Sequence, residues 1–91
     1  MLRIITRAST PQESILAVYG KIAGPEVELL AEEGQRHLEQ TTRLVLLLDG
    51  VQFIDESGLN LLRRWSELYL VLRGGTAFVR ALLLAEGLQV E

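Results

Sequence analysis

The sequence predicts an α/β domain built on a four-stranded mixed sheet, and three observations support this fold class. Short apolar stretches rich in β-branched residues alternate with longer stretches whose apolar residues recur at helical spacing. The stretch Leu44–Leu48 has no polar alternation, as expected of a central strand buried on both faces. Glycine and proline separate the segments. The resulting order is β-β-α-β-α-β-α, and right-handed crossovers would place the helices mainly on one face.

The first forty residues predict two strands and a helix. Residues Leu2–Arg7 are typical of an edge strand, and a turn-rich loop at 9–14 leads to an inner strand at Ile15–Ile22. The short loop favours antiparallel pairing of these strands. Pro25 suits the first helical position, and the helix should run to about Gln40. Its apolar face carries Val27, Leu30, Ala31, Gly34 and Leu38.

The second half of the chain predicts two more helices and one more strand. Asp49-Gly50 should end the central strand, and a helix is expected from Gly58. Residues Tyr69–Arg73 could extend that helix or form a last strand, and their β-branched and aromatic content favours the strand. Thr76 could cap a last helix, with Gly87-Leu88 as its stop signal. The buried stripe of the second helix should contain Leu59, Leu61, Leu62 and Trp65.

Composition excludes several classes of function. A chain of 91 residues should form a single domain over residues 1–91. A net charge of −3 argues against nucleic-acid binding, and the absence of cysteine excludes disulfides and thiol-based metal sites. We expect no metal, no cofactor and an ordinary surface role for the lone His37. Neither a signal peptide nor an apolar stretch long enough for a membrane helix occurs, so a cytoplasmic protein without membrane insertion is expected.

The junction Phe53-Ile54-Asp55-Glu56-Ser57-Gly58-Leu59 is the most informative part of the sequence. Ser57 would lie at or near the helix N-cap, where a phosphate on its oxygen would be tolerated. Asp55 would stand beside that hydroxyl, and Gly58 would allow another backbone, such as a partner loop, to approach closely. The residues alone permit an equally simple interpretation, in which Ser57 is a helix cap, Asp55 a turn residue and Gly58 a packing requirement.

Three stretches of the chain carry a resemblance to a known family. Leu44–Asp55 looks like its central strand and following loop. Glu56–Leu62 stands where the family has an Asp-Ser-Ser-Gly-Leu helix start, with Asp55 in the place of its Asp. Phe78–Leu83, followed by Gly87-Leu88, is similar to its closing helix. The whole chain thus resembles the STAS domain, named for sulfate transporters and anti-sigma-factor antagonists, in a short stand-alone bacterial form.

The resemblance implies a protein–protein interaction module that binds an anti-sigma-type serine kinase. The family's phosphoacceptor is the hydroxyl residue before the glycine, a role that maps onto Ser57. Glu56 departs from the family motif by placing a second carboxylate beside the acceptor. The alternative function is therefore a constitutive STAS subunit of a lipid-transport ABC ATPase complex. The expected partner-binding residues are Asp55, Glu56, Ser57, Gly58, Asn60 and Arg64.

Catalysis is not expected from this sequence. A Ser-His-Asp hydrolase would need Ser57, His37 and Asp55, yet neither a nucleophile elbow nor an oxyanion arrangement is visible. A solvated helix face is the preferred interpretation of Arg63 and Arg64, with an acidic partner as the alternative. The apolar excess and the free edge of the first strand also leave room for a homodimer.

Overall fold

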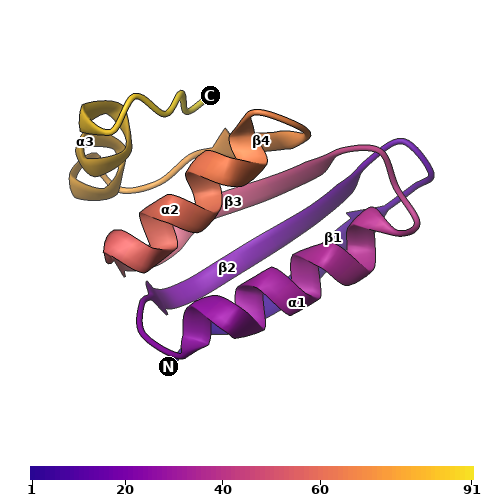
Figure 1. Ribbon diagram of the computed structural model, residues 1–91, viewed down its shortest axis with the longest axis horizontal. Coiled ribbons are helices and arrows are strands. Elements are labelled where there is room, and N and C mark those ends of the chain that lie inside the picture. Colours follow the sequence, from indigo (N-terminus) through magenta and orange to yellow (C-terminus); the bar gives the residue numbers. More distant parts are fainter.

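A four-stranded mixed sheet in the order β1-β2-β3-β4 forms the centre of the fold (Figure 1). The computed structural model describes residues 1–91. Strands β1 (Arg3–Ser9) and β2 (Ser14–Ile22) pair antiparallel, whereas β3 (Leu44–Ile54) and β4 (Leu70–Arg73) run parallel to β2. The predicted mixed sheet is confirmed, and so is the strand, rather than a helix extension, at β4.

Three helices cover one face of this sheet (Figure 1). They are α1 (Glu26–Leu38), α2 (Glu56–Ser66) and α3 (Ala77–Ala85). Alternate residues of the two inner strands point into the helical layer and join the helices in one core of 18 buried residues. The predicted placement of the helices is therefore confirmed. None of them is long and apolar enough to cross a bilayer.

Strand β3 is longer than the sequence predicts. Asp49-Gly50 was expected to end it, but the strand continues to Ile54 and stays paired with β2. Two register shifts against β2 absorb two additional residues of β3 along this second half. Gly50 makes room for the ring of Tyr19, because a Cβ atom at Gly50 would lie 2.3 Å from Tyr19 Cδ2. Pairing with the neighbouring strand thus overrides a composition typical of a turn.

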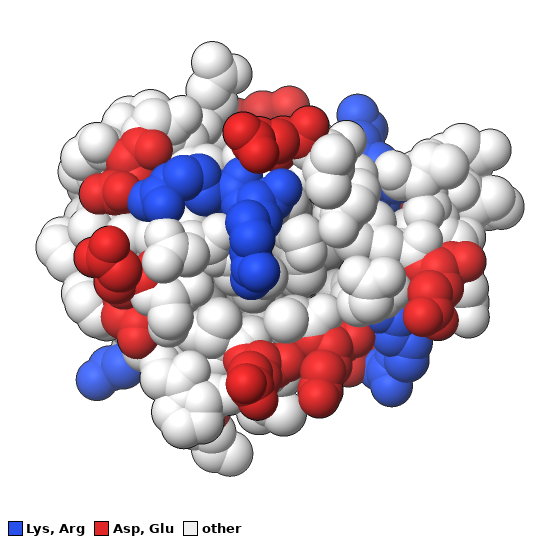
Figure 2. All heavy atoms as spheres, viewed as in Figure 1, with Lys and Arg blue, Asp and Glu red and all other residues white.

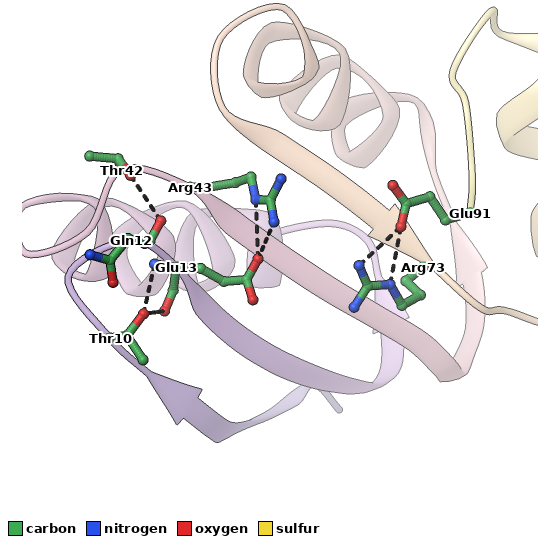
Figure 3. A network of polar contacts seen from close by, with 7 residues as sticks. All are labelled: Thr10, Gln12, Glu13, Thr42, Arg43, Arg73 and Glu91. Atoms are coloured by element: carbon green, nitrogen blue, oxygen red, sulfur yellow. Dashed lines mark hydrogen bonds and ion pairs between the residues drawn. The ribbon is translucent and has the colours of Figure 1, made fainter.

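The face of the sheet turned away from the helices has no layer of its own. Leu44, Leu46 and Leu48 are fully buried under the helices, and Val45 on the opposite face is also buried, but Leu47 is half-buried. The prediction of a strand buried on both faces is therefore only partly right. Two ion pairs, Glu13–Arg43 and Arg73–Glu91, lie over this open face (Figure 3).

Helices α1 and α2 pack closely where a glycine faces the only tryptophan. A Cβ atom at Gly34 would lie 2.4 Å from Trp65 Cη2, so only glycine admits the indole here. Trp65 is 6% exposed, which confirms its prediction as a core anchor. Pro25 is the N-cap of α1 rather than its first helical residue, and the helix ends at Leu38, two residues before the predicted boundary.

Helix α3 has the predicted signals at both ends. Thr76 is its N-cap, and its hydroxyl accepts a hydrogen bond from the Val79 N–H at 3.2 Å. At the other end Gly87 has a φ of +79°, and the Leu88 N–H donates to the Leu83 carbonyl at 2.9 Å. This is a Schellman-type stop, in which the buried Leu88 supplies the hydrophobic contact.

Candidate functional site

Asp55 caps helix α2 and fixes where the helix begins. It has extended backbone angles, and its Oδ1 accepts a hydrogen bond from the Gly58 N–H at 2.8 Å. The helix therefore starts at Glu56, two residues before the predicted start at Gly58. Ser57 lies near the N-cap, within the range that the sequence predicts, but the cap itself is the carboxylate of Asp55.

Ser57 is the second residue of the helix, and its side chain is exposed. Its hydroxyl donates a hydrogen bond to Asp55 Oδ1 at 2.8 Å, so the carboxylate stands beside it, where the sequence places it. The hydroxyl is thus held at the solvent-facing start of a helix, where free N–H groups and the helix dipole favour negative charge.

The Asp55 carboxylate joins the start of α2 to the loop that precedes α1. While Oδ1 accepts from Ser57 and Gly58, Oδ2 accepts from the Gly24 N–H at 2.9 Å. These hydrogen bonds, that of Gly24 first, lower the pKa of Asp55, because each donor stabilises the ionised carboxylate. Asp55 is therefore an anion at neutral pH. The sequence does not predict this hydrogen bond from Gly24, because Gly24-Pro25 signals only a turn.

Gly58 brings the start of α2 against the end of β2. A Cβ atom at this position would lie 2.5 Å from the Ile22 carbonyl oxygen and 2.9 Å from Ile54 Cγ2. The same Ile22 carbonyl accepts a hydrogen bond from the Asp55 N–H at 3.1 Å. The close backbone approach expected at Gly58 is therefore made within the domain, by Ile22.

The remaining polar residues of the site differ in how they are held. Asn60 Oδ1 accepts from Arg63 at 2.6 Å, and Arg63 also pairs with Glu86 of the segment after α3. Glu56 and Arg64 are exposed and make no side-chain hydrogen bond or ion pair. Figure 2 shows a small group of cationic side chains on this helix-bearing face, with acidic side chains on either side. Arg64 and Glu56 are thus free to contact a partner.

A family model described as "STAS domain" matches residues 4–82 of the chain. The chain belongs to the STAS domain family. Among solved structures it is similar to one titled "Structure of the Anti-Sigma Factor Antagonist SpoIIAA in its Unphosphorylated Form", with a TM-score of 0.72 and 16% sequence identity. The match covers 98% of this chain and 88% of that one. A search of curated protein sequences finds no match.

Membership of the STAS family agrees with the sheet and helices of this fold. The family match includes the whole of β3 and α2, and the SpoIIAA structure supports the same fold. The resemblance drawn from the residues is therefore confirmed at the level of family and fold.

His37 is remote from Ser57, so the two residues do not form a catalytic pair. Its ring nitrogens lie 3.2 Å from Ser14 Oγ and 3.3 Å from Thr6 Oγ1, at the C-terminal end of α1. Gly24, which touches Asp55, precedes α1, and the eleven helical steps from Glu26 to His37 span about 17 Å. The prediction of an ordinary surface histidine is wrong, since His37 is half-buried and its ring bonds side chains of β1 and β2 to α1.

Proposed function

We propose that this STAS domain is a partner-switching interaction module. In this proposal the start of α2 docks on an anti-sigma-type serine kinase in the cytoplasm, and Ser57 receives a phosphoryl group. The observation that carries the proposal is the exposed Ser57 hydroxyl, held 2.8 Å from the carboxylate of Asp55 at a helix start. The similarity in fold to an anti-sigma factor antagonist supports the kind of partner.

Phosphorylation would change both the charge and the hydrogen bonding of this surface. The γ-phosphoryl group of ATP would pass to Ser57 Oγ, with loss of the hydroxyl proton and release of ADP. A phosphoserine carries about −1.5 to −2 charges and no longer donates to Asp55. The new charge would stand beside Asp55 and Glu56, so a partner surface complementary to the free hydroxyl would meet up to two added negative charges. Since about 1.4 kcal/mol is tenfold in affinity, losing a few kcal/mol would release the partner.

The test combines phosphorylation and binding. The domain is incubated with the cognate kinase and ATP, and its intact mass is measured. We expect a gain of one phosphate in the wild type and in Ser66→Ala, a control at another exposed serine of α2, but no gain in Ser57→Ala. Titration calorimetry should show that Ser57→Asp binds the kinase at least tenfold more weakly. A mass gain that persists in Ser57→Ala would refute the switch.

Glu56 supports a second candidate function. Its exposed carboxylate stands next to Ser57, so part of the charge that phosphorylation would add is already present. A constitutive subunit of a lipid-transport ABC ATPase would use the same surface without a switch. Stable co-purification with such an ATPase, unchanged by Ser57→Asp, would favour this function over partner switching.

A further inference from the structure

Both phenylalanines of the chain are exposed and stacked on each other. The rings of Phe53 and Phe78 lie 6.3 Å apart between centroids, with an interplanar angle of 16°. Their exposed fractions are 38% and 56%, in a domain whose tryptophan is almost fully buried. Aromatic side chains, phenylalanine included, are enriched in the cores of protein interfaces.

The aromatic pair lies at the same end of the sheet as Ser57. Phe53 precedes the helix cap Asp55 by two residues, and Phe78 follows the helix cap Thr76 by two. Ile54 is buried beneath the helices, so its neighbour Phe53 projects from the opposite face of β3. Ser57 is only four residues further along the chain, at most about 14 Å away, and Phe78 stacks on Phe53, so a footprint of standard size, about 800 Å² on each partner, spans both the start of α2 and the aromatic pair.

The negative charge at this end of the sheet indicates what charge a binding partner must carry. Glu56 is an exposed carboxylate without an ion pair, and Asp55 stays ionised because of its three hydrogen bonds. No arginine or lysine forms an ion pair with either residue. A cationic side chain of a partner can neutralise this charge, and the face of an aromatic ring also attracts cations.

We propose that Phe53 and Phe78 anchor the kinase partner, which covers them with aliphatic groups and presents an arginine or lysine to Glu56. This inference rests on the proposed function, because it names the contact surface of that same partner. The aromatic pair would bury apolar surface against the partner, and the negative charge of Glu56 requires a positive charge on the partner. Ser57 then lies inside the footprint, where the added volume and strong hydration of a phosphate would disturb the fit.

Binding of the cognate anti-sigma-type kinase tests this proposal by calorimetry. We expect Phe78→Ala to weaken binding about 10- to 100-fold. Phe78→Lys should weaken it further, because the new cation would face the partner's own. The control is Leu84→Ala, which truncates a side chain of the same helix that is 60% exposed, and it should change affinity less than about twofold. Glu56→Gln should lower affinity and flatten its dependence on salt.

The outcomes separate this inference from the proposed function. If Ser57→Asp abolishes binding and Phe78→Ala leaves it unchanged, the aromatic anchor is refuted and the switch stands. If the wild type does not bind the kinase with or without nucleotide, both proposals fail. Thermal melts of Phe78→Ala and Phe78→Lys must match the wild type closely, since the side chain is mostly exposed. If the Tm of Phe78→Ala is lower than that of the wild type but the Tm of Phe78→Lys is not, the affinity of Phe78→Lys is the test of the anchor.

Discussion

Replacing Gly58 by alanine should destabilise the domain, although the same change stabilises most helices. In an unobstructed helix, alanine is favoured over glycine by up to about 1 kcal/mol. At Gly58 the added Cβ would lie 2.5 Å from the Ile22 carbonyl oxygen and 2.9 Å from Ile22 Cγ2 and Ile54 Cγ2. Ordinary carbon contacts lie at about 3.5–4.0 Å, so the start of α2 must move away from β2.

The size of the effect follows from what this movement disturbs. Overpacking of this kind costs about 1–3 kcal/mol. The shift also stretches the 3.1 Å hydrogen bond from the Asp55 N–H to the Ile22 carbonyl, worth about 1 kcal/mol. After subtraction of the gain in helix propensity, the free energy of unfolding should fall by about 1–3 kcal/mol. For a domain of this size, Tm should then fall by roughly 5–20 °C.

Urea denaturation followed by circular dichroism measures this free energy, and a thermal melt gives Tm. The matched control is Arg64→Ala on the same helix, where an exposed side chain without a hydrogen bond or ion pair is removed. Arg64→Ala should change the free energy of unfolding by less than about 0.5 kcal/mol. A Gly58→Ala variant as stable as the wild type, or more so, would show that α2 does not depend on this close contact.

Three further substitutions test the caps. The pKa of Asp55 is lowered in the folded state, so its charge stabilises the fold above the unfolded pKa of about 3.9 and this contribution is lost as the pH falls through the folded pKa. Asp55→Asn should therefore have a lower free energy of unfolding in urea than the wild type at pH 7, and the two values should converge in acid. A difference that does not change with pH would contradict this role of the Asp55 charge. Thr76→Ala should lose about 1 kcal/mol, seen as a lower urea midpoint. Gly87→Ala, at a φ of +79°, should lose about 1–2 kcal/mol in the same assay, and unchanged midpoints would argue against both caps.

The element order was predictable from the sequence because each element carries a local signal. Alternation and β-branched content mark the strands, and Thr76 and Gly87 mark the ends of α3 through chemistry confined to a few residues. The end of β3 was not predictable in this way. Asp49-Gly50 has the composition of a turn, and only the neighbouring β2 keeps it extended.

The candidate site was predictable in its position but not in its connections. Asp55 and Ser57 are both good N-cap residues, and a linear sequence does not say which carboxylate or hydroxyl meets the free N–H groups. The hydrogen bond from Gly24 to Asp55 spans 31 residues, and the stacking of Phe78 on Phe53 depends on where α3 lies. Contacts of this kind arise only once the sheet has brought its strand ends together.

Trp65, which packs against Gly34, is an intrinsic fluorescent probe of the domain. Because the chain has one tryptophan, its intrinsic fluorescence comes largely from a single buried site between α1 and α2. The indole lies in the same helix whose first turn holds Ser57, so emission wavelength and quenching can follow events at that turn without a dye. Stopped-flow mixing with a partner that lacks tryptophan would then yield association and release rates directly on the unmodified protein.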